Sequence, residues 1–156
     1  MAFYIASDRP LPLTKQPVYE KDCISSQTWP RDAQPFHTAA LRPEQEAVRS
    51  HFNCPDVLYA GSYEGCGCGF NYGREYPGEE NDPEHRRAAN ESVSELLRYV
   101  RNFGVREIYS CWFDDESKPT LRERSVTLEE LASPEFVFED QELLRIAQAG
   151  RTYRNV

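Results

Sequence analysis

Two cysteines alternate with three glycines in the run Gly65-Cys66-Gly67-Cys68-Gly69, and Glu64 stands directly before it. A thiolate is both a nucleophile and a ligand for soft metals, and a neighbouring carboxylate can accept or donate a proton. Glycine reaches backbone conformations that other residues avoid and lets a ligand approach the main chain. We therefore predict a site here. Cys66, Cys68 and Glu64 are its candidate catalytic residues, and the glycines Gly65, Gly67 and Gly69 are candidates for ligand binding.

Two nucleotide-binding motifs are excluded for this run. The dinucleotide motif requires a helix that begins within the glycines, so that the helix N-terminus meets the pyrophosphate. In this chain Pro77 and Asn81 stand between the glycines and the next helical pattern. A phosphate-binding P-loop would need Gly-Lys followed by Ser or Thr, which the run lacks. What remains is a smaller polar or anionic ligand bound by successive N–H groups, or a tight glycine turn that binds nothing.

A catalytic cysteine is one chemistry that the run could support. A thiol is activated by N–H dipoles, by a cation or by a nearby base. The glycine run could supply the dipoles, and His37 or His85 could supply the base, although the spacing places neither of them at the thiols. The alternative is that one cysteine faces inward as a small apolar residue.

A structural metal is the other chemistry, with Cys66 and Cys68 as two soft ligands. His51 and Cys54 precede the strand predicted at residues 57–63, whereas the two thiols follow it. At ~3.3 Å per strand residue, the two pairs would be roughly 20 Å apart. Better third ligands at the same end of the sheet would be Cys111, Asp114 or Asp115, or Cys23 from the N-terminal segment. Because Cys-x-Cys alone is a weak zinc signal, no metal ligand is assigned.

The hydrophobic pattern predicts a βαβ unit around the run. Residues 57–63 and 107–113 are nearly continuous apolar runs, typical of strands covered on both faces. Residues 83–103 form an amphipathic helix between them. We expect the two strands to lie parallel in one sheet, with a right-handed crossover. Further strands are predicted at residues 2–6, 37–41 and 136–138, and further helices at residues 44–52, from Thr127, and from Asp140 to Gly150.

The carboxyl ends of parallel strands are where sites form in open α/β sheets. Asp114 and Asp115 follow the strand at 107–113, so we predict Asp114 as a further catalytic residue and Asp115 as a ligand-binding residue. If the first strand is parallel as well, Asp8 and Arg9 would join them as ligand-binding residues. An acidic turn of this kind is otherwise a solvated loop.

The whole chain is predicted to be one α/β domain over residues 1–156, with a central, mostly parallel or mixed sheet of about four to five strands flanked by helices. The many prolines of residues 1–42 indicate an extended segment packed on the body. The net charge is −8, which disfavours nucleic acid as a partner. No apolar stretch approaches the length of a membrane span. The chain lacks a signal-peptide pattern and has five cysteines, an odd number, which favours a cytoplasmic protein with reduced thiols.

The leading functional hypothesis is an enzyme that binds a small polar or anionic ligand at the glycine-cysteine run, with a thiol or carboxylate in the site. The alternatives are a non-catalytic binding or regulatory module and a structural metal site at Cys66 and Cys68. In the module, Phe70, Tyr72 and Tyr76 would form a protein-contact surface. The sequence does not indicate a cofactor, a reaction class or an oligomeric state.

Overall fold

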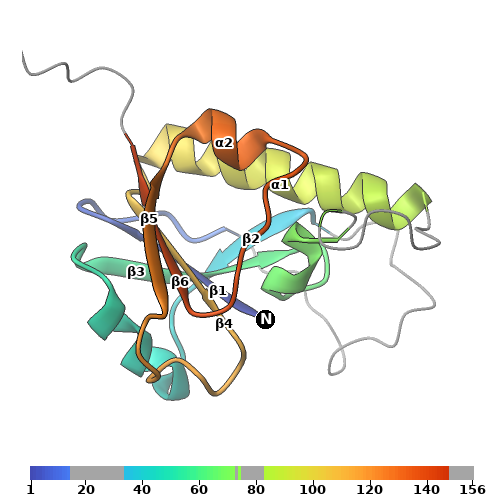
Figure 1. Cartoon of the computed structure of the whole chain (residues 1–156). Helices are drawn as coiled ribbons and strands as arrows, with labels where there is room; N and C mark the ends of the chain where they lie inside the picture. Colours follow the sequence, from blue (N-terminus) through green and yellow to red (C-terminus); the bar gives the residue numbers. More distant parts are fainter. Residues whose placement is uncertain (15–33, 73, 75–82, 148–156) are drawn as a thin grey trace, which may run out of the picture.

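A computed structural model of the chain describes residues 1–14, 34–72, 74 and 83–147. Six strands form one mixed sheet in the order β2-β3-β1-β4-β6-β5, and Figure 1 shows α1 and α2 together on one side of it. The strands are β1 (Ala2–Ser7), β2 (Phe36–Ala39), β3 (Asp56–Ser62), β4 (Glu107–Cys111), β5 (Arg122–Val126) and β6 (Glu142–Ile146). The helices are the 3-10 helices η1 (Pro43–His51) and η2 (Gly67–Phe70) and the α-helices α1 (Pro83–Phe103) and α2 (Leu128–Ala132). The sequence predicts a mostly parallel or mixed sheet of about four to five strands; the sheet is mixed, and it has six strands.

β1 lies at the centre of the sheet, between β3 and β4. Its Tyr4 is opposite Tyr59 of β3 on one side and Tyr109 of β4 on the other, and both pairings are antiparallel. β3 and β4 are therefore parallel to each other, as predicted, but they are not neighbours. The expected βαβ unit is split by a strand inserted from the N-terminus, which the local pattern of residues 57–113 could not reveal.

The two faces of the sheet carry separate apolar clusters because side chains alternate along each strand. Phe3 of β1 points to the face that carries α1, where its ring lies 4.7 Å from that of Phe70 and 4.9 Å from that of Phe138. Tyr4 points to the face that carries η1 and donates a hydrogen bond of 2.7 Å to the buried carboxylate of Glu116. The near-continuous apolar character of the central strands thus reflects burial on both faces of a largely antiparallel sheet.

α1 has the boundaries that the sequence predicts, and its apolar stripe packs on the sheet. Val93, Leu96 and Val100 are buried in the cluster that contains Phe3. The apolar repeat of this helix also predicts inward positions for Leu97 and Phe103, but Leu97 is only partly buried and Phe103 is 43% exposed. Tyr99 is buried instead, and its hydroxyl donates a hydrogen bond to the Pro12 carbonyl.

The C-terminal part of the described chain departs most from the sequence prediction. Instead of the helix expected from Asp140, residues 142–146 form β6, which pairs with β4 and places Leu144 opposite Ile108. The turn before it holds Gln141 in a left-handed conformation, with φ of 51°. Residues 136–138 form no strand. Phe136 and Phe138 are nevertheless buried, so the apolar pattern reflects the packing of a loop and not the hydrogen-bonded pairing of a strand.

β5 was not predicted because its residues give no alternating apolar signal. Four of its five residues are exposed, and three of them are charged. Charged side chains are typical of an edge strand, where they discourage pairing with other chains. β5 is held by parallel pairing with β6 and by an ion pair between Arg124 and the buried Glu142.

The N-terminal segment packs on the sheet over the part that is described. Leu11 is buried, and Thr14 and Thr38 exchange hydrogen bonds between backbone nitrogen and side-chain oxygen at 3.0 and 2.7 Å. Residues 15–33 lie outside the described residues, and the expectation of an extended segment is not tested there. The helix predicted at residues 44–52 is the 3-10 helix η1, which buries Gln45 and Val48.

Candidate functional site

The glycine-cysteine run folds back on the end of β3. The carbonyl of Cys66 accepts hydrogen bonds from the backbone nitrogen and the hydroxyl of Ser62, at 2.9 and 2.6 Å. The nitrogen of Gly67 then donates to the carbonyl of Met1, which fastens the run to the start of β1. The position of the thiols is therefore set by β3 and β1 together.

Each glycine of the run meets a steric requirement of the fold. Gly65 has φ of 80°, a left-handed conformation that favours glycine. A Cβ on Gly67 would lie 2.8 Å from Cβ of Phe3, and a Cβ on Gly69 would overlap the side chain of Ser62. The nitrogens of Gly65 and Gly67 already donate to backbone carbonyls. These two groups are not available to an anion, so the predicted ligand-binding role of the glycines has no support from the backbone donors at these positions.

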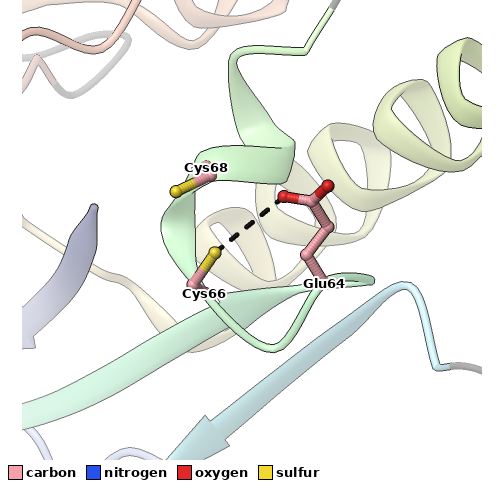
Figure 2. Close-up of side chains that lie close together, drawn as sticks. All are labelled: Glu64, Cys66 and Cys68. Carbon is pink, nitrogen blue, oxygen red and sulfur yellow. Dashed lines mark hydrogen bonds between the residues drawn. The ribbon is translucent and has the colours of Figure 1, made fainter. Parts of the chain in front are cut away.

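Glu64, Cys66 and Cys68 come together as the cysteine–carboxylate cluster (Figure 2). Their carboxylate oxygen and two sulfur atoms all lie within 4.8 Å of one another, and all three residues are half-buried. Cys66 comes from the turn after β3 and Cys68 from η2. The Cys66 thiol points to Oε2 of Glu64 at 3.9 Å. The nitrogen of Met1 lies 2.8 Å from Sγ of Cys68.

The pKa values of the two thiols are shifted in opposite directions. The single hydrogen of the Cys66 thiol has both Glu64 and Cys68 within reach. When it points to Cys68 it stabilises the Cys68 thiolate and lowers the pKa of Cys68, and the nitrogen of Met1 acts in the same direction. The same hydrogen bond raises the pKa of Cys66, which burial raises further. Burial also raises the pKa of Glu64. The arrangement therefore holds a thiolate at Cys68 beside a protonated thiol at Cys66, with a carboxylate next to that second thiol.

Two other cysteines provide a contrast within the same chain. Cys54 and Cys111 are buried on the η1 face, and burial raises the pKa of each to about 12. Both are protonated near neutral pH, as expected for cysteines with a packing role. Cys111 was a candidate third metal ligand, but it is not part of the cysteine–carboxylate cluster. Cys23 lies outside the described residues.

The acidic turn after β4 lies at the same edge of the sheet as the end of β3, because Ala2 of β1 is opposite Cys111. Its side chains are nevertheless directed elsewhere. Asp114 is exposed and lines a hollow beside η1, and Asp115 pairs with Lys118 at 2.7 Å. Neither belongs to the cluster around Cys66 among the described residues.

Asp8 and Arg9 lie at the opposite edge of the sheet, which corrects the expectation that depended on a parallel first strand. Ser7, at the end of β1, is opposite Asp56 at the beginning of β3. Asp8 there contacts Arg106 at 3.5 Å. The antiparallel direction of β1 instead brings Met1, the residue before this strand, to the thiols. No local feature of the sequence signals this contact, because it depends on the strand order.

Of the loop aromatics proposed for a protein-contact surface, Phe70 is not available to one. Phe70 is completely buried against Phe3 and Phe36. The ring of Tyr72 lies 5.1 Å from that of His85. The charge of His85 also acts on Glu64, where it opposes the effect of burial on the pKa. Tyr76 lies outside the described residues.

Comparisons with known proteins give no relative for this arrangement: no protein-family model, curated protein or solved structure matches the chain. Within residues 1–14, 34–72, 74 and 83–147, no helix combines the length and the apolar character that crossing a bilayer requires.

Proposed function

We propose that this protein is a thiol–disulfide oxidoreductase that acts on small polar or anionic disulfides, with Cys68 as the attacking thiolate. The observation that carries the proposal is the convergence of the Cys66 and Cys68 sulfurs and a Glu64 carboxylate oxygen within 4.8 Å, with the pKa of Cys68 lowered beside the nitrogen of Met1. A thiolate attacks a disulfide, and a second thiol close to it can resolve the mixed disulfide that forms. Lowered thiol pKa values are typical of reactive cysteines in oxidoreductases.

The first step forms a bond between Sγ of Cys68 and one sulfur of the substrate R–S–S–R′. The substrate S–S bond breaks, and R′S⁻ leaves with the bonding electron pair. Met1 and the Cys66 thiol stabilise the attacking thiolate before this step. In the resulting intermediate, Cys68 is joined to R through a mixed disulfide.

The second step requires Cys66 to lose its proton. The Glu64 carboxylate lies 3.9 Å from Sγ of Cys66 and is placed to accept that proton. Cys66 then attacks Sγ of Cys68, and the S–S bond between Cys68 and the sulfur of RS breaks. The leaving group RS⁻ takes the proton from Glu64. The two cysteines end as a disulfide, and the substrate is reduced by two electrons. A cellular thiol of low molecular weight resets the pair by the reverse exchange.

The proposal is tested by the rate of Cys68 alkylation as a function of pH, measured with iodoacetamide in the folded protein. The rate should reach its plateau well below the pH that an ordinary thiol of pKa about 8.5 requires. Changing Cys66 to alanine removes the hydrogen-bond donor, so the pH of half-maximal rate should rise. Cys54→Ala is the matched control and should leave that pH unchanged. An unperturbed profile for Cys68 would contradict the proposal.

A structural or catalytic metal at the same cluster is the second candidate. It is favoured by the convergence of two sulfurs and one carboxylate oxygen within 4.8 Å, a donor set that suits zinc. The alkylation experiment separates the two functions. A metal would protect Cys66 and Cys68 together, and a chelator would remove the protection. The oxidoreductase is alkylated at Cys68 with or without the chelator.

A further inference from the structure

A second pocket lies on the face of the sheet that carries η1, and it reaches the glycine-cysteine run only at Gly65. This pocket of about 650 Å³ is bounded by β2, by the first turn of η1 and by the segment near Leu13. Its polar side chains include His37, Arg42 and Gln45, together with the hydroxyl groups of Thr14, Thr38 and Tyr59. The volume lies within the range of natural small-molecule sites.

The imidazole ring of His37 occupies the space that a side chain at Gly61 would otherwise fill. His37 is paired with Gly61 across β2 and β3, and a Cβ on Gly61 would overlap the imidazole ring. The ring is only 4% exposed, and its Nδ1 atom has no hydrogen-bond partner in the described part of the chain. Buried polar atoms without a partner are rare in folded proteins, and a bound ligand is one explanation. Burial lowers the pKa of His37, so the ring is neutral near neutral pH.

The side chain of Gln45, which also lines the pocket, is held by a hydrogen bond. Its Oε1 atom accepts a hydrogen bond of 3.0 Å from the backbone nitrogen of Arg42, and the residue is 4% exposed. This bond leaves the amide NH₂ as the remaining group of the side chain. That NH₂ group is a hydrogen-bond donor, and Gln45 lines the pocket.

The charge of the lining is opposite to that of the protein as a whole. The chain carries a net charge of −8, yet no carboxylate belongs to the described lining of this pocket. Arg42 is its one cation. It contacts Glu44 at 3.7 Å, but both side chains are largely exposed, so the contact costs little to break. An arginine, an amide NH₂ group and a neutral imidazole together favour a ligand with a single negative charge.

We propose that this pocket binds a small organic monocarboxylate, whose carboxylate lies on Arg42, Gln45 and Nδ1 of His37 and whose apolar part lies toward Leu13. A single guanidinium matches a carboxylate in charge and in planar, bidentate geometry. Ala39 and Ala40 add apolar surface to the lining. The side chains that would hold the carboxylate are not those of the cysteine–carboxylate cluster, although Gly65 of the glycine-cysteine run also lines the pocket.

The test uses sodium benzoate as the probe, with binding followed by NMR shifts of the His37 ring and of the Ala39 and Ala40 amides. Benzoate should bind saturably, whereas benzamide, its uncharged isostere, should not shift these signals. Arg42→Gln should weaken benzoate binding by about tenfold to a hundredfold, the loss expected for a hydrogen bond to a charged group. Arg42→Lys should retain part of the affinity.

Arg49→Gln is the control, because Arg49 lies in η1 outside the pocket lining and the change removes the same charge. Neither this variant nor Cys68→Ser should change benzoate binding. The proposal is overturned if benzoate fails to saturate, if benzamide binds equally well, or if Arg42→Gln and Arg49→Gln have the same effect. Inorganic phosphate is titrated in parallel, and tighter binding of phosphate than of benzoate would contradict the choice of a carboxylate.

Discussion

Changing Cys68 to serine is expected to abolish the mixed disulfide that the protein forms with glutathione disulfide, whereas changing Cys66 to serine should accumulate it. The reason is the order of the two steps. Cys68 is the thiolate that attacks, and Cys66 is the thiol that resolves the intermediate. Without Cys66 the bond between Cys68 and glutathione cannot be broken from within the chain. The adducts are identified by mass spectrometry of the intact protein and of its peptides.

The comparison is made in a Cys23→Ser background, which removes the one thiol outside the described residues. Cys54 and Cys111 remain as internal controls, because their raised pKa values keep them protonated and they should carry no glutathione. Glu64→Gln should slow the second step and leave the first step nearly unchanged, because Glu64 contacts Cys66. Adducts that form equally on Cys66 and Cys68 would refute the assigned roles.

Leu96→Ala is expected to lower the free energy of unfolding by about 2–5 kcal/mol, the usual range when a buried leucine is truncated and leaves a cavity. Leu96 is completely buried between α1 and the sheet. Leu97→Ala is the matched control, with the same change one position along the same helix. Its side chain is only partly buried, so its cost should be smaller.

Chemical denaturation of the three proteins measures these differences. The prediction fails if Leu97→Ala costs as much as Leu96→Ala, since the packing of α1 would then differ from the one described. A cost below about 1 kcal/mol for Leu96→Ala would mean that this side chain is not in the core.

The sequence was most informative where local patterns decide structure. The boundaries of α1 follow from its proline start and apolar stripe. The helix predicted from Thr127 is α2, which is capped by reciprocal side-chain to backbone hydrogen bonds between Thr127 and Glu130. The strand at residues 142–146 was mistaken for a helix because Leu143, Leu144 and Ile146 fit either period over so short a run. Pairing with β4 decides the outcome, and tertiary context of that kind overrides propensity.

The candidate site was predicted in part, for the same physical reason. Glu64, Cys66 and Cys68 are neighbours in sequence, so a single tight turn brings them together. Asp8 and Arg9 depended on the direction of β1, and that direction is antiparallel. The contact of Met1 with Cys68 and the placement of His37 over Gly61 both arise from pairings between strands. Such pairings are set by the whole sheet and leave no mark on the local sequence.

The central claim is that Cys66 and Cys68 form one redox pair, and the most direct measurement is the product of a single turnover. The reduced protein is mixed with one equivalent of glutathione disulfide, quenched with acid, alkylated and digested. The proposed mechanism predicts two equivalents of glutathione thiol and one peptide in which Cys66 and Cys68 have lost two hydrogen atoms and resist alkylation. If both cysteines are still alkylated and glutathione disulfide is recovered intact, the pair does not carry out disulfide exchange.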